Sequence, residues 1–325
     1  MKDKIKRYLS ALVLVCATTG SARGAKMDNG NQKKIIEVKQ GDVVNLGNLK
    51  AKLVTFRTNS SDYTEEKRKS SAYFELQPGD TKEPLEVGGY YEQAPLINGY
   101  FVSLLSSKVD SAKIELRPAR LLLNAEKFSA KLKNQSLEVG KSVQINGLDL
   151  NIKQFYFDGY QKSLIGQLKL KKGAVEREIF DSGPFNFLDY YINFKAVGDD
   201  FQIEVRPLAI NEKFKLFEKE SIVFEDAGIE IILNEQKIEN DFVNMFFTFK
   251  KAGKEKKEEM KLYFTQEPIN YNDVPPGKEP APNDRKFSAE KSKIQIEFEG
   301  YVLEHNRKYE IMNEHTTNIF ELLKK

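Results

Sequence analysis

The chain repeats one pattern of strands and turns at an interval of about ninety residues, and this repeat constrains its fold more than any other feature. Residues 37–53 and residues 138–152 each contain an apolar stretch, a glycine turn and a second, alternating stretch. The two blocks also close alike, since residues 111–118 and residues 201–207 both end in an acidic residue, an apolar residue, arginine and proline. A block of this length can bury a core of its own. The repeat therefore predicts modules in tandem.

The pattern inside the blocks predicts β-structure. Apolar and polar residues alternate over short runs separated by turn residues, which is typical of half-buried antiparallel strands. The predicted fold class is all-β, with three tandem small antiparallel β-sandwich or barrel-like modules and a short C-terminal helix. An immunoglobulin-like architecture is one form that such modules take, although the chain has no Cys, Trp, Cys spacing and no tryptophan.

The predicted boundaries follow the repeat and the two ends of the chain. The third block is the most divergent, and we place its closing strand at residues 292–298, which lack the Arg-Pro ending. Between the first two modules, the triplet Leu121-Leu122-Leu123 is compatible with either a short linking helix or a strand. The C-terminal helix is predicted because apolar residues 319, 320, 322 and 323 would share one side of it. The assigned ranges are 1–25 (signal peptide), 26–34 (polar spacer), 35–118 (first module), 119–127 (linker), 128–207 (second module), 208–312 (third module, with a proline-rich loop at 267–285) and 313–325 (C-terminal helix).

The first residues have the layout of a secretory signal. Basic residues up to Arg7 precede the apolar stretch 9–17, and small residues follow as far as Ala25. The apolar stretch is far shorter than the ~20 residues that span a bilayer. We therefore expect an exported protein, periplasmic or extracellular, with no transmembrane segment beyond the signal. A lipid anchor at Cys16 is the weaker alternative because Val15 is not small, and a chain with this single cysteine can form no internal disulfide.

The charge of the chain argues against nucleic acid as a partner. Removing residues 1–25 takes five basic residues and one acid from totals of 51 and 48, so the exported protein would carry a net charge of about −1. Such a protein has no overall field that attracts a polyanion. We expect its partner to be another protein or a cell-envelope polysaccharide, while the oligomeric state stays open.

The sequence contains no signature of catalysis. Its two histidines, His305 and His315, lie ten residues apart and fit no standard zinc spacing, so we expect a solvated or capping role for them. The pair Asp199-Asp200 follows Gly198 between two predicted strands, where acids favour turns. We therefore predict a protein that is not an enzyme and that has no cofactor, no metal and no catalytic residue.

Tyrosines in three aromatic clusters are the candidate binding residues. Tyrosine combines an apolar face with a polar tip, which suits contact surfaces and sugar platforms, but it also suits sheet cores and cross-strand pairs. Alternate residues of a strand face opposite sides, so half of each cluster should lie in a core. The candidates are Tyr90, Tyr91, Tyr156, Tyr160, Tyr190 and Tyr191.

Two polar segments have ordinary structural explanations. The run 250–259 interleaves lysines with glutamates between two apolar strands, which indicates a solvated hairpin tip more than an anion-binding patch. The proline-rich loop holds five of the eleven prolines and is an extended excursion, although it could also present a peptide to a partner.

The first functional hypothesis is an exported, non-enzymatic protein whose tandem β modules bind another protein or an envelope polymer. Open sheet edges and tyrosine-rich loops would be its contact points. The alternative is a secreted or periplasmic polysaccharide hydrolase that uses paired carboxylates. A third hypothesis is a protease inhibitor that presents the proline-rich loop.

Overall fold

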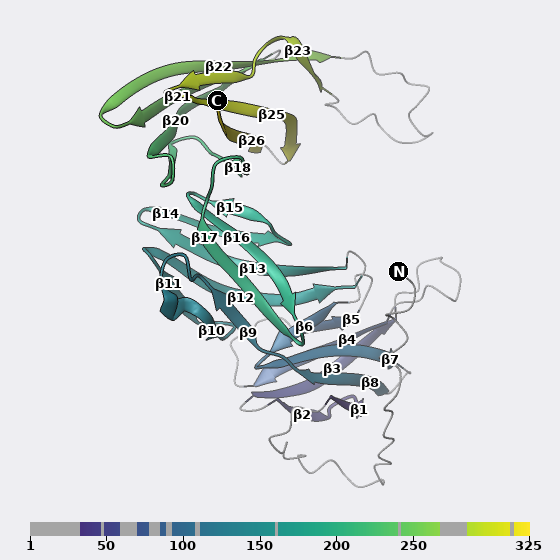
Figure 1. Cartoon of the computed structure of the whole chain (residues 1–325). Coiled ribbons are helices and arrows are strands. Elements are labelled where there is room, and N and C mark those ends of the chain that lie inside the picture. Colours follow the sequence, from purple (N-terminus) through teal and green to yellow (C-terminus); the bar gives the residue numbers. More distant parts are fainter. Residues whose placement is uncertain are drawn as a thin grey trace, which may run out of the picture.

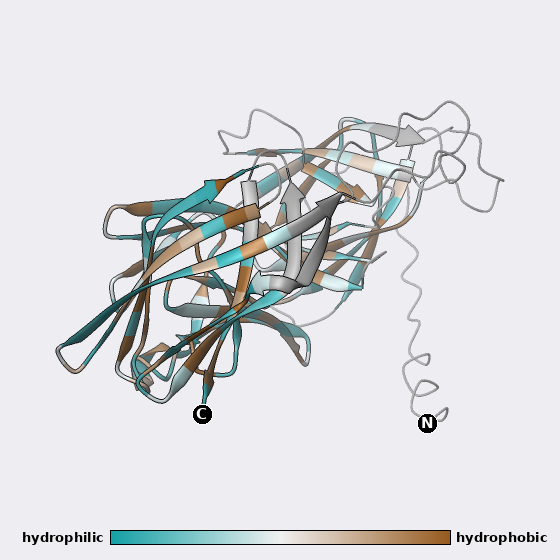
Figure 2. Ribbon diagram, turned by 90° about the horizontal axis from the view of Figure 1, so that it is seen from above, coloured by the Kyte–Doolittle hydropathy of each residue, from teal (hydrophilic) through white to brown (hydrophobic). Residues whose placement is uncertain are grey.

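The structure is a computed structural model that describes residues 33–46, 49–58, 70–77, 85–88, 93–107, 111–159, 162–239, 242–266, 285–312 and 315–325. In these ranges the fold is nearly all β, and the single helical element is the 3-10 turn η2 (Ala130–Leu132). Figure 1 shows the strands in three groups that follow one another along the chain, from purple at the N-terminal side to yellow. Apolar and polar residues alternate along many strands, as Figure 2 shows, which is the pattern that predicted them.

The first group of strands belongs to two sheets. Four strands form a small antiparallel sheet, in the order β2 (Val43–Leu46), β3 (Leu49–Thr58), β4 (Ser70–Gln77) and β5 (Leu85–Gly88). The second sheet has eight strands, ordered β1 (Lys34–Lys39), β8 (Ser111–Pro118), β7 (Tyr100–Ser107), β6 (Ala94–Ile97), β12 (Leu148–Asp158), β13 (Ser163–Lys172) and β14 (Val175–Asp181), with β11 (Ser142–Ile145) also paired to β12.

The eight-stranded sheet crosses the predicted boundary between the first two modules. Its two halves join where Tyr156 and Phe157 of β12 pair with Pro95 and Ala94 of β6. Fully separate tandem modules are therefore not what the sheets show.

A five-stranded sheet faces the second half of the eight-stranded one. Its order is β10 (Lys133–Leu137), β9 (Leu121–Asn124), β17 (Asp200–Pro207), β16 (Tyr190–Val197) and β15 (Phe185–Phe187). Strand β9 answers the question left open for Leu121 to Leu123, because these residues form a buried strand that runs parallel to β17.

The last group again consists of two sheets. One has the order β18 (Lys213–Lys215), β26 (His315–Lys324), β25 (Tyr301–Met312) and β24 (Gln295–Phe298). The other has the order β19 (Glu220–Phe224), β20 (Ile229–Ile238), β21 (Phe242–Lys251), β22 (Lys254–Gln266) and β23 (Arg285–Lys293). None of the five sheets closes on itself among the described strands, so the barrel-like alternative is wrong.

The predicted C-terminal helix is also wrong, because these residues form strand β26. Phe320 and Leu322 are buried while Ile319, Glu321 and Leu323 between and beside them are half-buried, so the segment alternates with period two. Pairing with β18 on one side and β25 on the other satisfies its backbone and overrides the local helical pattern.

Buried apolar side chains form three cores. The first core is the cluster between Val38 and Leu116, the second the cluster between Leu96 and Val205, and the third the cluster between Leu208 and Leu322. The sequence ranges of the first two overlap, since Leu96 of β6 packs into the second core. Each core lies between two sheets, as the alternating strands require.

One backbone feature recurs three times, once beside each core. A residue with positive φ, at 88°, 88° and 65° in turn, donates its N–H to a carbonyl in the next long strand, and that strand is bulged immediately after the acceptor. The third donor is a lysine where the first two are glycines, and this hides the third copy in the sequence. The bonds are Gly41 N to Leu53 O (2.8 Å), Gly140 N to Ile152 O (2.7 Å) and Lys219 N to Leu233 O (2.6 Å).

A glycine in β13 allows the second core to close. A Cβ atom at Gly166 would lie 2.7 Å from Cζ of Phe194 on the facing sheet. The Phe194 ring is held in turn by edge-to-face contact with Phe155, at a centroid distance of 5.5 Å. The two sheets can therefore approach this closely only while residue 166 lacks a side chain.

We predict that Gly166→Ala lowers the free energy of unfolding by about 1–3 kcal/mol, because overpacking forces the Phe194 ring out of its place. Urea denaturation measures the change. In a Phe194→Leu background the same substitution should cost clearly less, since the obstructing ring is gone. Equal costs in both backgrounds would contradict the packing argument.

Candidate binding surface

The structure separates the predicted tyrosines into different environments. Tyr190 lies in the second core with 1% of its surface exposed. Its hydroxyl donates to the carbonyl of Asn146 at 2.6 Å, and Lys172 Nζ lies 4.7 Å from its ring centroid. Burial raises the pKa of the Tyr190 hydroxyl, although the nearby Lys172 opposes this. Tyr190 therefore belongs to the core and presents no contact surface.

Tyr191, on the opposite face of β16, supports an arginine. It pairs across the strands with Arg206, whose guanidinium carbon lies 3.7 Å from the tyrosine ring centroid. The guanidinium forms a two-pronged ion pair with Glu212, whose carboxylate also accepts the N–H of Ala209 at 2.9 Å. Burial would raise the pKa of Glu212, but these hydrogen bonds outweigh it and lower that pKa. We call this cluster of Tyr191, Arg206, Ala209 and Glu212 the second joint, because it fixes the chain where it passes from the second core to the third. The first joint, between the first and second cores, is described below.

Two further contacts tie the third core to the second. The side-chain amide of Asn186 in β15 donates to the carbonyls of Leu188 and Lys215, and its oxygen accepts the N–H of Lys215 at 2.7 Å. Arg177 of β14 forms an ion pair with the buried Glu220 and stacks on Phe217, with 4.0 Å from its guanidinium carbon to the ring centroid. A planar guanidinium makes both contacts at once, which an ammonium cannot do.

An equivalent joint links the first core to the second. Arg117, across the strands from Phe101, has its guanidinium carbon 4.9 Å from that ring centroid and donates to Asp199. Arg120 binds Asp200 through its backbone N–H at 2.8 Å and through its guanidinium, and the hydrogen bonds from its side chain lower the pKa of Asp200. The acids at 199 and 200 thus act as ion-pair partners at the first joint, defined by these five residues.

Tyr156 lies on the outer face of the eight-stranded sheet, directly opposite Ile165 of β13. Its ring is 8% exposed and lies 6.1 Å, between centroids, from the ring of Phe180 in β14. Phe180 is 61% exposed, which is the largest value among the exposed large hydrophobic residues of the described chain. Phe180 is not among the residues predicted from the sequence. Its signal was a phenylalanine in phase with Glu176 and Glu178, on the polar side of an alternating strand.

Strand β14 is an edge of the sheet. Seven residue pairs join it to β13, from Gly166 with Asp181 to Lys172 with Val175, and no described strand pairs with its other side. The edge strand β14 with its Phe180, together with Tyr156 of β12 on the same outer face, forms the candidate binding surface. Tyr90, Tyr91 and Tyr160 lie outside the described residues.

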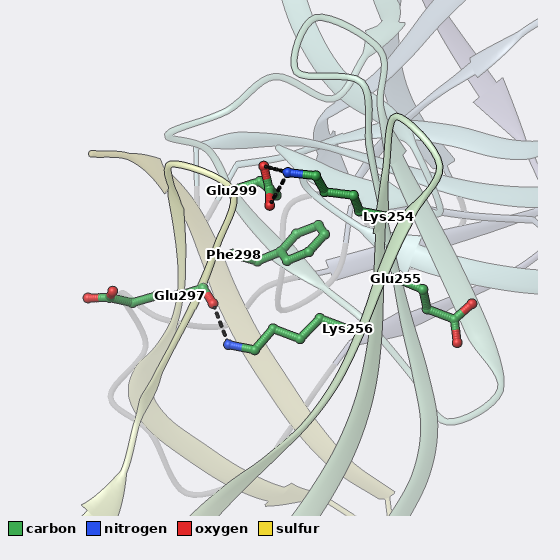
Figure 3. A pocket seen from close by; sticks show the side chains of 6 residues that line it. All are labelled: Lys254, Glu255, Lys256, Glu297, Phe298 and Glu299. Atoms are coloured by element: carbon green, nitrogen blue, oxygen red, sulfur yellow. Dashed lines mark hydrogen bonds and ion pairs between the residues drawn. The ribbon is translucent and has the colours of Figure 1, made fainter.

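Two grooves lie beside the β21–β22 hairpin of the third group, and the acids that line them are paired with lysines. The first, about 490 Å³, is lined by the start of β22 and by the end of β24 with the turn that follows it (Figure 3). Lys254 reaches across it to Glu299 at 3.0 Å, and Lys256 donates to the carbonyl of Glu297 at 3.0 Å. The second groove, about 450 Å³, lies along the same hairpin, beside Val223 and Glu230. The charged run expected at a hairpin tip therefore extends into both strands, and two of its lysines tie the two sheets together.

His305 is not solvated, which corrects the expectation for it. Its exposed fraction is 0%, and its ring meets Phe320 edge to face at a centroid distance of 5.3 Å. Burial lowers the pKa of His305 to about 4, although a hydrogen bond with Asn318 opposes this. The imidazole is therefore neutral near pH 7 and belongs to the third core. The side chain of His315 lies outside the described residues.

Within the described ranges, no group of three or more His, Cys, Asp or Glu side chains is arranged to hold a metal ion. No helix in the same ranges has the length and apolar character needed to cross a membrane.

We predict that Arg206→Ala lowers the free energy of unfolding by about 1–3 kcal/mol, since it removes a stacked, two-pronged ion pair from a partly buried site. Lys195→Ala, which breaks an exposed ion pair with Glu204, should cost under about 1 kcal/mol. Urea denaturation of both variants makes the comparison. A cost for Arg206→Ala no larger than for Lys195→Ala would show that the second joint adds nothing.

His305 gives a second prediction, for the dependence of stability on pH. The pKa of His305 is lower in the folded protein than its ordinary value of 6.5. Between pH 6.5 and 4, His305 is therefore protonated in the unfolded chain and neutral in the folded chain. The free energy of unfolding should therefore fall on acidification by up to about 3 kcal/mol from this group. The window from pH 6.5 to 5 isolates the effect, because unperturbed carboxyl groups titrate lower.

Urea denaturation across that window should show the slope in the wild-type chain and a flattened slope in His305→Gln. The matched variant His315→Gln serves as the control. A slope that remains in His305→Gln but disappears in His315→Gln would contradict the prediction, because it would attribute the pH dependence to His315.

The comparisons with known proteins give no relative from which to assign this chain. No protein-family model, no curated protein and no solved structure was found to match it. Its function must therefore be inferred from the two joints and the candidate binding surface.

Proposed function

We propose that the chain is an exported, non-enzymatic protein of three tandem β-sandwich modules that binds a partner through surfaces held at fixed positions. Three successive cores and the recurring hydrogen bond from a positive-φ residue to a bulged strand support the division into modules. The secretory layout of residues 1–25 supports export to the periplasm or beyond, with a lipid anchor at Cys16 as the less favoured form.

The observation that carries the proposal is the construction of the two joints. Each joint combines a stacked arginine with a carboxylate from the following block, and the first also has strand pairing between β6 and β12. Domains in one chain move relative to one another unless their interface is extensive. Arginines fixed in this way suit a protein whose task depends on spacing between surfaces.

Of the two partner classes expected, the geometry favours a protein over an envelope polymer. An open strand edge beside an exposed aromatic ring is suited to main-chain pairing with another polypeptide. The hydrolase alternative draws no support from the acids that line the two grooves, because each of them forms an ion pair with a lysine: Glu230, Glu255, Glu297 and Glu299. The proline-rich loop, on which the inhibitor hypothesis rested, falls mostly outside the described residues.

Affinity capture tests the proposal. The full chain is immobilised beside an unrelated β-sandwich protein, envelope proteins and soluble polysaccharides are passed over both, and the retained molecules are identified. We expect one protein to be retained by the chain alone, with micromolar or tighter affinity on re-measurement with purified partner.

Retention of a polysaccharide followed by release of new reducing ends would replace the proposal with the hydrolase. Equal retention on the chain and on the control protein, for every fraction, would also end it.

A further inference from the structure

We infer that the open edge of β14 binds an extended, basic segment of a partner protein as an added antiparallel strand. This inference rests on the proposed function and names the surface and the partner chemistry. Nothing in the predicted tyrosine set pointed to β14 itself.

The backbone of β14 supplies the affinity. All seven of its residues are paired to β13 without a register shift, so the strand is held in one register. The N–H and C=O groups that point away from β13 meet no described strand, and they form a template for a further strand. Antiparallel pairing is favoured because it is slightly more stable per residue than parallel pairing.

Phe180 supplies an apolar anchor at one end of the edge. Its ring is 61% exposed and rests beside the nearly buried rings and side chains of the outer face, at 6.1 Å from Tyr156. An apolar side chain on the added strand, opposite Phe180, would bury this ring on the surface that Tyr156 and Ile165 already form. Cross-strand aromatic and aliphatic pairs of this kind stabilise sheets.

The charges of β14 select the remainder of the segment. Glu176 and Glu178 face the same side as Phe180 and are both exposed. On the β13 side, Lys169 pairs with Glu176 at 2.7 Å and Gln167 donates to Glu178, and each contact uses one carboxylate oxygen. The one basic residue of the strand, Arg177, faces the other side and is occupied by Glu220 and Phe217. An added antiparallel strand would therefore meet the aromatic ring first and then acids at two alternate positions, which fits an apolar residue followed by Lys or Arg at two alternate positions.

The same charges argue against a second copy of this chain as the occupant. Two β14 strands paired about Glu178 would place the two Glu178 carboxylates directly opposite each other, and like charges at opposed positions destabilise a sheet. A two-residue shift toward Val175 brings the two copies of Arg177 together and Glu176 opposite Glu178. A two-residue shift toward Asp181 opposes no like charges, but it shortens the ladder to residues 177–181 and places the Glu178 carboxylate opposite the Phe180 ring.

The test uses the full chain and the seven-residue peptide Thr-Leu-Val-Lys-Thr-Lys-Val, blocked at both ends. In antiparallel pairing its leucine lies opposite Phe180 and its lysines opposite Glu178 and Glu176. Control peptides carry Glu at both lysine positions, or Pro in place of the central lysine, since proline cannot sustain a strand ladder. Binding is measured by calorimetry, and amide hydrogen exchange shows where the peptide binds.

We expect the lysine peptide to bind with a Kd on the order of 10–100 μM and to slow exchange in residues 175–181. Phe180→Asp should weaken binding about tenfold or more, while Ile238→Asp, at a residue of matched exposure (53%) in β20, should leave it unchanged. The double variant Glu176→Lys with Glu178→Lys should reverse the preference, so that the glutamate peptide binds better than the lysine peptide.

Three results would overturn the inference: no slowing of exchange in residues 175–181 at saturating peptide, binding that is indifferent to Phe180→Asp, or a chain dimer in sedimentation that Phe180→Asp dissociates. Affinity capture separates this failure from that of the proposed function. A partner that the wild-type chain and Phe180→Asp retain equally keeps the proposed function and removes β14 as its site. A partner lost from Phe180→Asp but kept by Ile238→Asp supports both.

Discussion

The contact on which the arrangement of the cores depends is an arginine held between an aromatic ring and a carboxylate. Arg206 lies at the end of β17, with its guanidinium carbon 3.7 Å from the Tyr191 ring centroid and with its two terminal nitrogens hydrogen-bonded to Glu212. Glu212 also holds the N–H of Ala209, so one side chain orders the whole passage from the second core to the third. A planar group that is always charged, such as the guanidinium, can stack on the ring and form a bidentate ion pair with the carboxylate at the same time. Strand β18 begins directly after Glu212, and its Phe214 pairs with Phe320 of β26.

Arg117 shows that this arrangement is used twice, with different partners. In each case the arginine stands across the strands from an aromatic residue, Phe101 or Tyr191, and precedes a proline. The carboxylate of the first joint comes from the turn before β17, while that of the second comes from the passage between cores. The Arg-Pro ending that marked the end of a block in the sequence is therefore, in the structure, the place where one core is fastened to the next.

The sequence predicted what depends on local alternation and missed what depends on distant partners. Strands such as β12 and β16 follow from period-two patterning, and the hairpin of β21 and β22 from its charged turn. The third copy was misaligned because Lys219 replaces the glycine of the turn and because no Arg-Pro marks its last strand. Its closing strand is β26, whose four clustered apolar residues look helical until β18 and β25 are placed beside it.

The same limit explains the errors at the candidate sites. Tyr190 and His305 have polar side chains that are nevertheless buried. Hydrogen bonds with Asn146 and Asn318, which lie elsewhere in the chain, make this burial possible. No pattern within a few residues of either one reports such a partner.

Phe180 shows the opposite case, in which a local pattern was informative. In a half-buried strand the residues in phase with Glu176 and Glu178 face water, so an apolar ring in that phase is exposed unless another element covers it. The described chain places no such element against β14. Acidic side chains protect an open edge from edge-to-edge association, but the exposed Phe180 ring at the end of this edge adds nothing to that protection. An exposed phenylalanine on an otherwise charged edge is therefore better explained by a contact that covers it than by stability of the isolated chain.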